Sequence, residues 1–192
     1  MSTCQAAGEV LMIGASAMDS PGSHALWLAR QAVEHHVRSR DLFTPATDPP
    51  SMLTNPGAAF VTLRLGKALR GCIGTLGATK PTLVLEIIAN AVAAASSDPR
   101  FPPVMATELA ALLYEVDILG AVEPIPDESH LDPEEYGIVV EAGSRRGVLL
   151  PAIEDVTSVR QQVTIARTKA SIRPNEAVTL YRFTVTRFRE MG

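Results

Sequence analysis

The sequence predicts an α+β fold, with a mainly antiparallel sheet and flanking helices. Three observations support this prediction. Segments rich in β-forming residues stand in neighbouring pairs separated by short turns, as in hairpins. Helical patterns follow these pairs without the regular strand–helix alternation of a parallel βαβ sheet. Hydrophobic residues make up 46% of the chain, which is sufficient for a full core.

The chain of 192 residues fits a single domain, with room for two lobes. Residues 1–19 show no clear periodicity, and we expect them to form a flexible extension. The single domain is then predicted over 20–192, and the sequence leaves the boundary between its lobes open.

Charge and apolar patterning exclude several classes of protein. Seventeen Lys and Arg against 21 Asp and Glu give a net charge of −4, so we expect no binding to nucleic acid, which requires a basic surface. The apolar stretch 10–17 is far shorter than the ~20 residues of a membrane span and lacks a basic flank. Cys4 and Cys72 are expected to be free thiols, which suits a reducing compartment. These features together predict a cytoplasmic protein without a membrane segment.

Three long helices are predicted. The first covers 21–38, because Ser20 is a good N-cap and Pro21 suits the first helical position. The second begins at Pro81, and its apolar residues cover so wide an arc that we expect it to be largely buried. The third is predicted over about 153–171.

The strands are predicted from β-forming residues and from period-two alternation. Two of them, over 58–65 and 68–76, form a hairpin. Glu115 and Asp117 alternate with apolar neighbours in a later strand, a pattern typical of one solvated face. The proline-containing segment 123–133 is predicted to be a loop. The remaining strands are predicted over 113–122, 137–141, 147–151 and 177–187.

The predicted hairpin carries the most specific motif of the chain. Residues 57–63, GAAFVTL, and 69–76, LRGCIGTL, closely resemble the signature of the AMMECR domain family, whose bacterial and archaeal members are called AmmeMemoRadiSam system protein A. The resemblance extends over roughly 24–188. Further matching segments are Asn90–Ala95, Asp98–Pro103, Glu115–Val116, Pro124–Pro126, Gly137–Val140, Arg145–Gly147, Leu150–Pro151 and Lys169–Ala170.

The resemblance implies a two-lobed α+β fold with the signature near a cleft between the lobes. It also implies partners, because family members are often encoded beside a Memo-like protein of the extradiol-dioxygenase superfamily and a radical S-adenosylmethionine enzyme. It implies no established reaction, so whether the chain is an enzyme stays open. Neither the resemblance nor the sequence indicates an oligomeric state.

The signature itself suggests a candidate site. In a regular strand Arg70, Cys72 and Gly74 share one face. A guanidinium beside a thiol favours the nucleophilic thiolate, and Gly71 and Gly74 leave room for a ligand. We therefore predict Cys72 as a catalytic nucleophile, with Arg70, Gly71 and Gly74 binding the substrate. The alternative is that Cys72 packs as a buried structural thiol and that the glycines mark a bulge.

Other cations in the matching segments are candidates for holding an anionic ligand. Arg100, Arg146 and Lys169 are predicted to contribute to substrate binding. Alternatively, Arg100 pairs with Asp98, while the other two are solvated at a hairpin tip and on a helix. Glu115 is a candidate ion-pair partner for these cations, and the sequence does not say which.

The remaining polar residues indicate no cofactor and no metal. The histidines, His24, His35, His36 and His130, give no base partner near the cysteine in sequence and no zinc-ligand spacing, and no phosphate-binding glycine loop is present. Two functions stay open. One is a small-molecule-binding or accessory component that works at the signature, and the other is a non-catalytic protein–protein adaptor.

Overall fold

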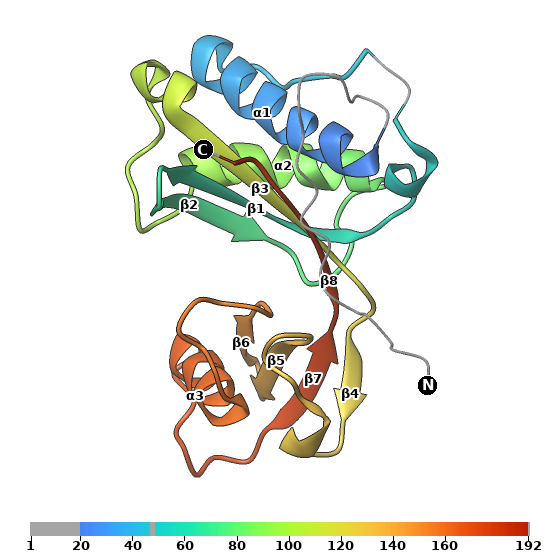
Figure 1. The fold of residues 1–192 in the computed structure, drawn as a ribbon, viewed down its shortest axis with the longest axis vertical. Coiled ribbons are helices and arrows are strands. Elements are labelled where there is room, and N and C mark those ends of the chain that lie inside the picture. The colour runs from blue at the N-terminus through green and yellow to red at the C-terminus, as the bar shows by residue number, and fades with distance from the viewer. Residues whose placement is uncertain (1–19, 47–48, 192) are drawn as a thin grey trace. The chain divides into compact units, whose positions relative to one another are not determined.

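The computed structural model describes residues 20–46 and 49–191 (Figure 1). The chain divides into two compact units. Unit 1 contains the described residues up to Ile118 together with those from Thr186 onward, and unit 2 is Leu119–Val185. Helices combine with two four-stranded sheets, which confirms the predicted α+β fold. The extension expected over 1–19 lies outside the described residues.

The elements follow one another in a simple order. The helices are α1 (Pro21–Ser39), α2 (Leu83–Ser96) and α3 (Val159–Lys169), with short 3-10 turns η1 (Ser51–Leu53), η2 (Ala106–Ala111) and η3 (Glu128–His130). The strands are β1 (Ala58–Leu65), β2 (Ala68–Gly74), β3 (Leu112–Leu119), β4 (Glu123–Ile125), β5 (Gly137–Ala142), β6 (Arg145–Leu149), β7 (Thr179–Phe183) and β8 (Val185–Arg189).

In unit 1 the helices α1 and α2 pack on the sheet β2-β1-β3-β8 (Figure 1). Ser20 caps α1 by accepting a hydrogen bond from the Ser23 amide, as the sequence predicts. The second helix is buried along most of its length, with Ile87 and Ala91 fully enclosed, which confirms the prediction from its wide apolar arc. Burial of this helix against β1 and β2 fixes the strands that carry the signature.

In unit 2 the helix α3 packs against the hairpin β5–β6 of the sheet β4-β7-β5-β6. The core of this unit is separate from that of unit 1 and is built mainly from aliphatic side chains. Its fully enclosed members include Ile138, Val140 and Ala166. Each unit therefore buries an apolar core of its own.

Three elements differ from the sequence prediction. The single strand expected over 177–187 is two strands, β7 and β8, which belong to different sheets. The loop expected over 123–133 begins with β4, which tolerates Pro124 because it is an edge strand of its sheet. The third helix starts only at Val159, because Ser158 caps it and Asp155 has a left-handed backbone with φ 68°.

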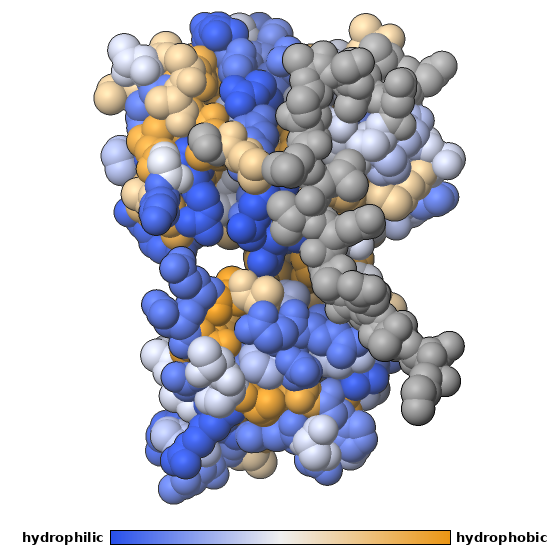
Figure 2. All heavy atoms as spheres, viewed as in Figure 1, coloured by the Kyte–Doolittle hydropathy of each residue, from blue (hydrophilic) through white to orange (hydrophobic). Residues whose placement is uncertain are grey.

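Among the described residues, no helix is both long enough and apolar enough to cross a membrane. Hydrophilic residues predominate on the visible surface of both units, and apolar residues gather in smaller areas (Figure 2).

Candidate functional site

The hairpin β1–β2 contains a bulge within the signature. Thr62 pairs with Cys72, and Leu63 pairs with Gly71. The next pair joins Arg64 to Leu69, so Arg70 is an extra residue without a partner on β1. The side-chain alternation that predicts Arg70 beside Cys72 is therefore interrupted at Arg70. A bulge at the signature glycines was the alternative that the sequence left open.

The side chain of Arg70 is committed to the segment before β3. Its guanidinium forms a bidentate ion pair with Glu108, with N···O distances of 2.7 and 3.0 Å. It also donates to the carbonyl oxygens of Pro102 and Pro103, at 2.9 and 3.3 Å. With 9% of its surface exposed, Arg70 anchors this segment to the strand. The predicted activation of the Cys72 thiol by Arg70 is therefore wrong.

The Cys72 thiol is in an environment that favours its neutral form. Its Sγ accepts a hydrogen bond from the Thr62 hydroxyl at 3.2 Å. Burial raises the pKa of the Cys72 thiol, and the charges of Asp117 and Glu115 act in the same direction. The Thr62 hydroxyl and the positive charge of Arg100 oppose the rise in pKa without cancelling it. The cation that acts on this thiol is thus Arg100 rather than Arg70, and the resting group is a thiol, not the expected thiolate.

Asp98 and Arg100 hold the backbone of Cys72. Asp98 Oδ2 accepts from the Cys72 amide at 2.8 Å, and Arg100 Nη2 donates to the Cys72 carbonyl at 3.2 Å. The two side chains are also ion-paired at 2.7 Å, which confirms the pairing that the sequence suggests. The hydrogen bonds from Arg100 lower the pKa of Asp98 well below its ordinary range, although burial opposes this. Because β2 is the edge strand of its sheet, this clamp occupies backbone groups that would otherwise be unpaired.

Two carboxylates of β3 are buried on the face that carries Cys72. Asp117 is fully enclosed and Glu115 is 7% exposed, so the solvated face predicted for this strand is wrong. Arg187 of β8 donates to Asp117 Oδ1 at 2.6 Å and lies 3.4 Å from Glu115. Charged partners on a neighbouring strand, far away in sequence, are what allow the two acids to be buried.

The buried negative charge of Asp117 is only partly compensated by its hydrogen-bond and ion-pair partners. Burial raises its pKa to about 6, although Arg187 lowers it by its charge and its hydrogen bond. The second oxygen, Oδ2, is buried and has no hydrogen-bond partner. A carboxylate with this pKa can exchange a proton near neutral pH, a property that clusters at functional sites.

The polar row, which we define as Cys72, Thr62, Asp117 and Arg187, contains one residue from each strand of the unit 1 sheet. Of these four residues, only Cys72 is a site candidate from the sequence alone. The acid–apolar alternation around Asp117 indicates that its side chain lies on the face opposite the apolar residues. The alternation does not indicate whether that face is solvated or buried. Thr62 and Arg187 carried no signal, because strand pairing alone brings them to this place.

The signature glycines do not leave open space. A Cβ on Gly71 would overlap the Ala94 carbonyl oxygen of α2, and a Cβ on Gly74 would overlap the Phe60 ring. Both glycines therefore allow close packing within unit 1, and the expected access for a ligand at these positions is wrong.

The two predicted cations of unit 2 have partners there. Arg146 Nε lies 2.5 Å from Glu141 Oε2, across the β5–β6 hairpin. Lys169 Nζ donates to the Val148 carbonyl at 3.1 Å. Both residues belong to unit 2, whereas Cys72 belongs to unit 1.

A further buried carboxylate organises the end of the signature. Glu86 of α2 is fully enclosed and accepts hydrogen bonds from the Thr75 and Thr79 hydroxyls and from the amides of Thr79 and Lys80. Burial alone would raise the pKa of Glu86, but these hydrogen bonds outweigh it and the pKa is lowered. This carboxylate fixes the loop that follows β2.

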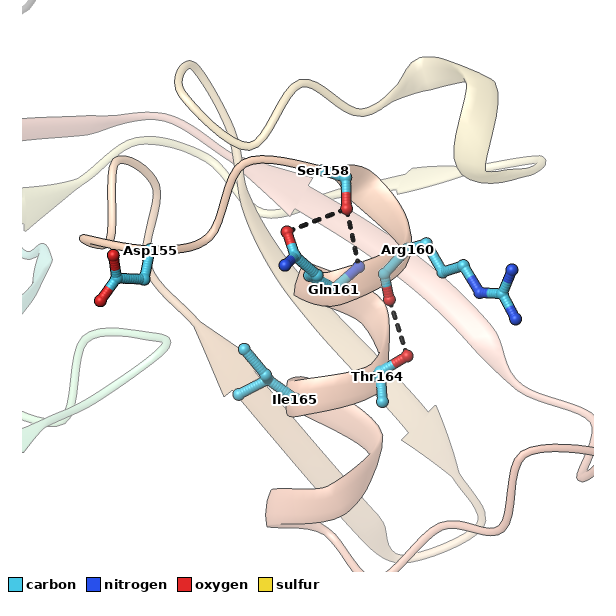
Figure 3. A pocket seen from close by; sticks show the side chains of 6 residues that line it. All are labelled: Asp155, Ser158, Arg160, Gln161, Thr164 and Ile165. Carbon is cyan, nitrogen blue, oxygen red and sulfur yellow. Dashed lines mark hydrogen bonds between the residues drawn. The ribbon is translucent and has the colours of Figure 1, made fainter.

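A shallow pocket of about 290 Å³ belongs to unit 2, along α3 (Figure 3). Three of its polar side chains form local hydrogen bonds: Ser158 Oγ with Gln161, and Thr164 with the Arg160 carbonyl. In Figure 3 the Arg160 side chain extends away from the other lining residues. The pocket therefore presents little chemistry. Within residues 20–46 and 49–191, no group of three or more His, Cys, Asp or Glu side chains could hold a metal ion.

Comparison with known proteins assigns the chain to a family. The sequence profile of the AMMECR1 family matches residues 26–188. A protein of Thermotoga maritima is 48% identical over 166 residues, which cover 85% of this chain and 95% of that protein. A protein of Clostridium acetobutylicum is 36% identical over 165 residues, which cover 85% of this chain and 35% of that longer protein.

The fold is also found in a solved structure. An uncharacterized protein from Pyrococcus horikoshii is 31% identical and superimposes with a TM-score of 0.83, covering 88% of this chain and 91% of that one. The family match spans both units, the hairpin β1–β2 and the polar row. The chain therefore belongs to the AMMECR1 family.

Proposed function

We propose that this AMMECR1-family protein is a small-molecule-binding or accessory component whose working site is the polar row at the signature. The observation that carries the proposal is the fully buried Asp117, ion-paired with the partly buried Arg187, on the sheet face that also holds the Cys72 thiol. Buried ion pairs contribute little net stability and are often neutral or worse compared with apolar side chains. A buried carboxylate with an unpartnered oxygen, on the sheet face that also carries a thiol, is therefore better explained by chemistry than by folding.

The proposal extends to the setting in which the protein works. The family resemblance suggests a pathway shared with a Memo-like protein and a radical S-adenosylmethionine enzyme, and these two are the proposed partners. Arg100 is the proposed group for an anionic part of the ligand, because it lies beside Cys72 and 53% of its side-chain surface is exposed.

The first test is the reactivity of Cys72 in the folded, full-length chain. Iodoacetamide should alkylate Cys72 in native buffer, as measured by mass spectrometry in a Cys4→Ser background that leaves one thiol. Alkylation should become faster as pH rises, because burial holds the thiol in its neutral form. If Cys72 is modified only when the chain unfolds, this site has no accessible thiol and the proposal fails.

The second test concerns the partners. The protein would be co-expressed with a Memo-like protein and a radical S-adenosylmethionine enzyme from the same organism, and complexes would be captured through a tag on this chain. Capture that survives Cys72→Ser fits an accessory component that binds its partners outside the polar row. If neither protein is captured by the wild-type chain, the proposed pathway is contradicted.

The adaptor alternative has less support from the signature strand. Arg70 and Gly71 are buried, and the edge of β2 is occupied by Asp98 and Arg100 at Cys72. A docking strand needs exposed side chains or a free edge. If Arg100→Ala abolished capture of the Memo-like protein while the fold and the Cys72 reactivity stayed intact, the adaptor function would be favoured instead.

A further inference from the structure

A second row of charged side chains lies on the same face of the unit 1 sheet as the polar row. Arg64 of β1, Glu115 of β3 and Arg189 of β8 are each two residues away from a member of the polar row. Side chains two residues apart on a strand point to the same face of a sheet. In the strand order β2-β1-β3-β8, Glu115 therefore stands on the strand between the two arginines.

Glu115 pairs with both of these arginines through one oxygen. Its Oε2 is 4.0 Å from Arg64 Nε and 3.5 Å from Arg189 Nε, while its Oε1 is 3.4 Å from Arg187 Nε. Glu115 is only 7% exposed, so the carboxylate is fixed within the sheet face. A fixed carboxylate restrains both arginine side chains before any ligand arrives, which lowers the entropy cost of binding. We call Arg64 and Arg189 the arginine pair.

The arginine pair is accessible and has donors to spare. The exposed fractions of the two side chains are 40% for Arg64 and 43% for Arg189. Among the described residues, Arg189 donates no hydrogen bond, and Arg64 donates one, from Nη1 to the Lys67 carbonyl at 3.3 Å. Each guanidinium has five N–H donors. Most of these donors are therefore available to an acceptor from outside the protein.

The charges around the arginine pair do not balance. The guanidiniums of Arg64, Arg187 and Arg189 face the two carboxylates of Glu115 and Asp117. One positive charge is therefore in excess here, on a chain whose net charge is −4. Planar guanidinium groups match the oxygens of phosphates and carboxylates, so this excess favours an anion of that kind.

We propose that the arginine pair binds the anionic group, a phosphate or a carboxylate, of the small molecule that occupies the polar row. This inference deepens the proposed function and rests on it, because it assigns a ligand class to the same sheet face. The charges of Glu115 and Asp117 act on the Cys72 thiol, so the two rows lie within electrostatic range of each other. Arg100 remains the cation beside the thiol, and the arginine pair is a second, separate anion site.

The test is a titration of the full-length wild-type protein with inorganic phosphate at constant ionic strength. Proton–nitrogen correlation NMR spectra follow the Nε–H signals of the arginine side chains. The signals of Arg64 and Arg189 should shift together and saturate with one Kd of about 1 mM, the range expected for a ligand of so few atoms.

Arg38 is the internal control in the same spectra. Its side chain is 62% exposed and it pairs with Glu34 on α1, so it reports the general effect of the anion on a surface arginine. If the signals of the arginine pair shift no more than the Arg38 signal, or shift without saturating, the inference is overturned. This comparison uses the wild type alone and depends on no variant.

Substitutions then locate the bound anion. Arg64→Gln and Arg189→Gln should each weaken phosphate binding about tenfold, because each removes charge-assisted hydrogen bonds. Arg38→Gln removes an exposed cation from α1 and should leave the Kd within about twofold. Equal weakening by all three variants would show attraction by net charge alone and would contradict a site at the arginine pair.

A parallel titration with acetate distinguishes the two kinds of anion. If phosphate binds more tightly than acetate, the ligand class is a phosphate-bearing molecule. If acetate binds more tightly, it is a carboxylate-bearing molecule. If neither anion saturates the signals of the arginine pair, the inference fails.

The outcomes separate this inference from the proposed function. If Cys72 reacts in the folded chain and neither anion binds at the arginine pair, the proposed function stands and the ligand class is overturned. If phosphate or acetate binds there and Cys72 is inert, the arginine pair is an anion site without the proposed chemistry beside it, and the proposed function fails.

Discussion

At the scale of single residues, the buried Asp117 makes the stability of the protein depend on pH in an unusual direction. Its folded pKa is about 6, above the value near 3.9 of an unfolded aspartate. A raised folded pKa contributes stability that is present at low pH and is lost as pH rises through about 6.

The expected result is a gain of wild-type stability on mild acidification. Relative to Asp117→Asn, the wild-type free energy of unfolding should rise by about 1 kcal/mol between pH 7 and pH 5. Urea unfolding of both proteins at the two pH values measures this difference. Groups that titrate alike in both proteins, His24 among them, cancel in the comparison. A constant difference between the two proteins would show that Asp117 does not titrate in this range.

For Arg70 we expect a structural role and no part in the reactivity of the Cys72 thiol. Arg70→Lys should cost about 2–4 kcal/mol of unfolding free energy, because one ammonium cannot replace the bidentate pair with Glu108 and the contacts with Pro102 and Pro103. Arg64→Lys should cost less than about 1 kcal/mol, because 40% of the Arg64 side-chain surface is exposed and its nitrogen is 4.0 Å from Glu115.

The same variant tests whether Arg70 activates the thiol. Under conditions where Arg70→Lys is fully folded, Cys72 should be alkylated at the wild-type rate, because the guanidinium is bound to Glu108. A large loss of Cys72 reactivity in the folded variant would restore the role that the sequence suggested for Arg70.

At the scale of elements, the glycine of the signature strand is required by the contact between β2 and α2. Gly71→Ala should destabilise unit 1 by about 2 kcal/mol or more, because the added methyl would overlap the Ala94 carbonyl oxygen and the helix would have to shift. Gly77→Ala is the matched control, since its Cβ would meet no atom within 4 Å. Thermal unfolding of the two variants should therefore differ, and similar melting temperatures would show that the helix adapts easily.

The loop after β2 depends on one carboxylate in the same way. Glu86→Gln should make the Thr75–Lys80 loop more mobile, because an amide group has one acceptor oxygen where the carboxylate has two. Faster exchange of the Thr79 and Lys80 amides would report this change. Unchanged exchange at both amides would contradict a role for Glu86 in fixing the loop.

A single sequence predicts several helices and strands of this fold but few residues of the candidate site. The first helix, the strand over 58–65 and the buried second helix follow from local patterns, namely an N-cap with proline, β-forming residues and a wide apolar arc. The bulge at Arg70 does not follow, because it depends on the partner strand. The same applies to Asp117, whose burial depends on Arg187, 70 residues later in the chain. Of the candidate site, the sequence therefore predicts Cys72 but not the residues that strand pairing brings onto the same face.

Local sequence patterns also do not predict where the chain passes from one sheet to the other. The run 177–187 has continuous β propensity, yet the chain leaves one sheet and joins another at Thr184, whose carbonyl accepts from the Gly120 amide. Nothing in the propensity of the run marks that change, because both halves are strands.

At the scale of the whole molecule, each unit has its own apolar core, which predicts two regions of separate stability. Ile87 lies in the core of unit 1 and Ile138 in the core of unit 2, and both are fully buried. Replacing either by Ala should cost about 2–5 kcal/mol where the cavity forms. If the units open independently, that loss is confined to one of them.

Amide hydrogen exchange measures this confinement. In Ile138→Ala the amides of β5, β6 and β7 should exchange faster while those of β1 and β2 keep their wild-type rates, and Ile87→Ala should give the reverse. The polar row lies in unit 1, so Ile138→Ala should also leave the alkylation rate of Cys72 unchanged. Equal acceleration of exchange in both units, by either variant, would instead show that the two cores unfold as one cooperative structure.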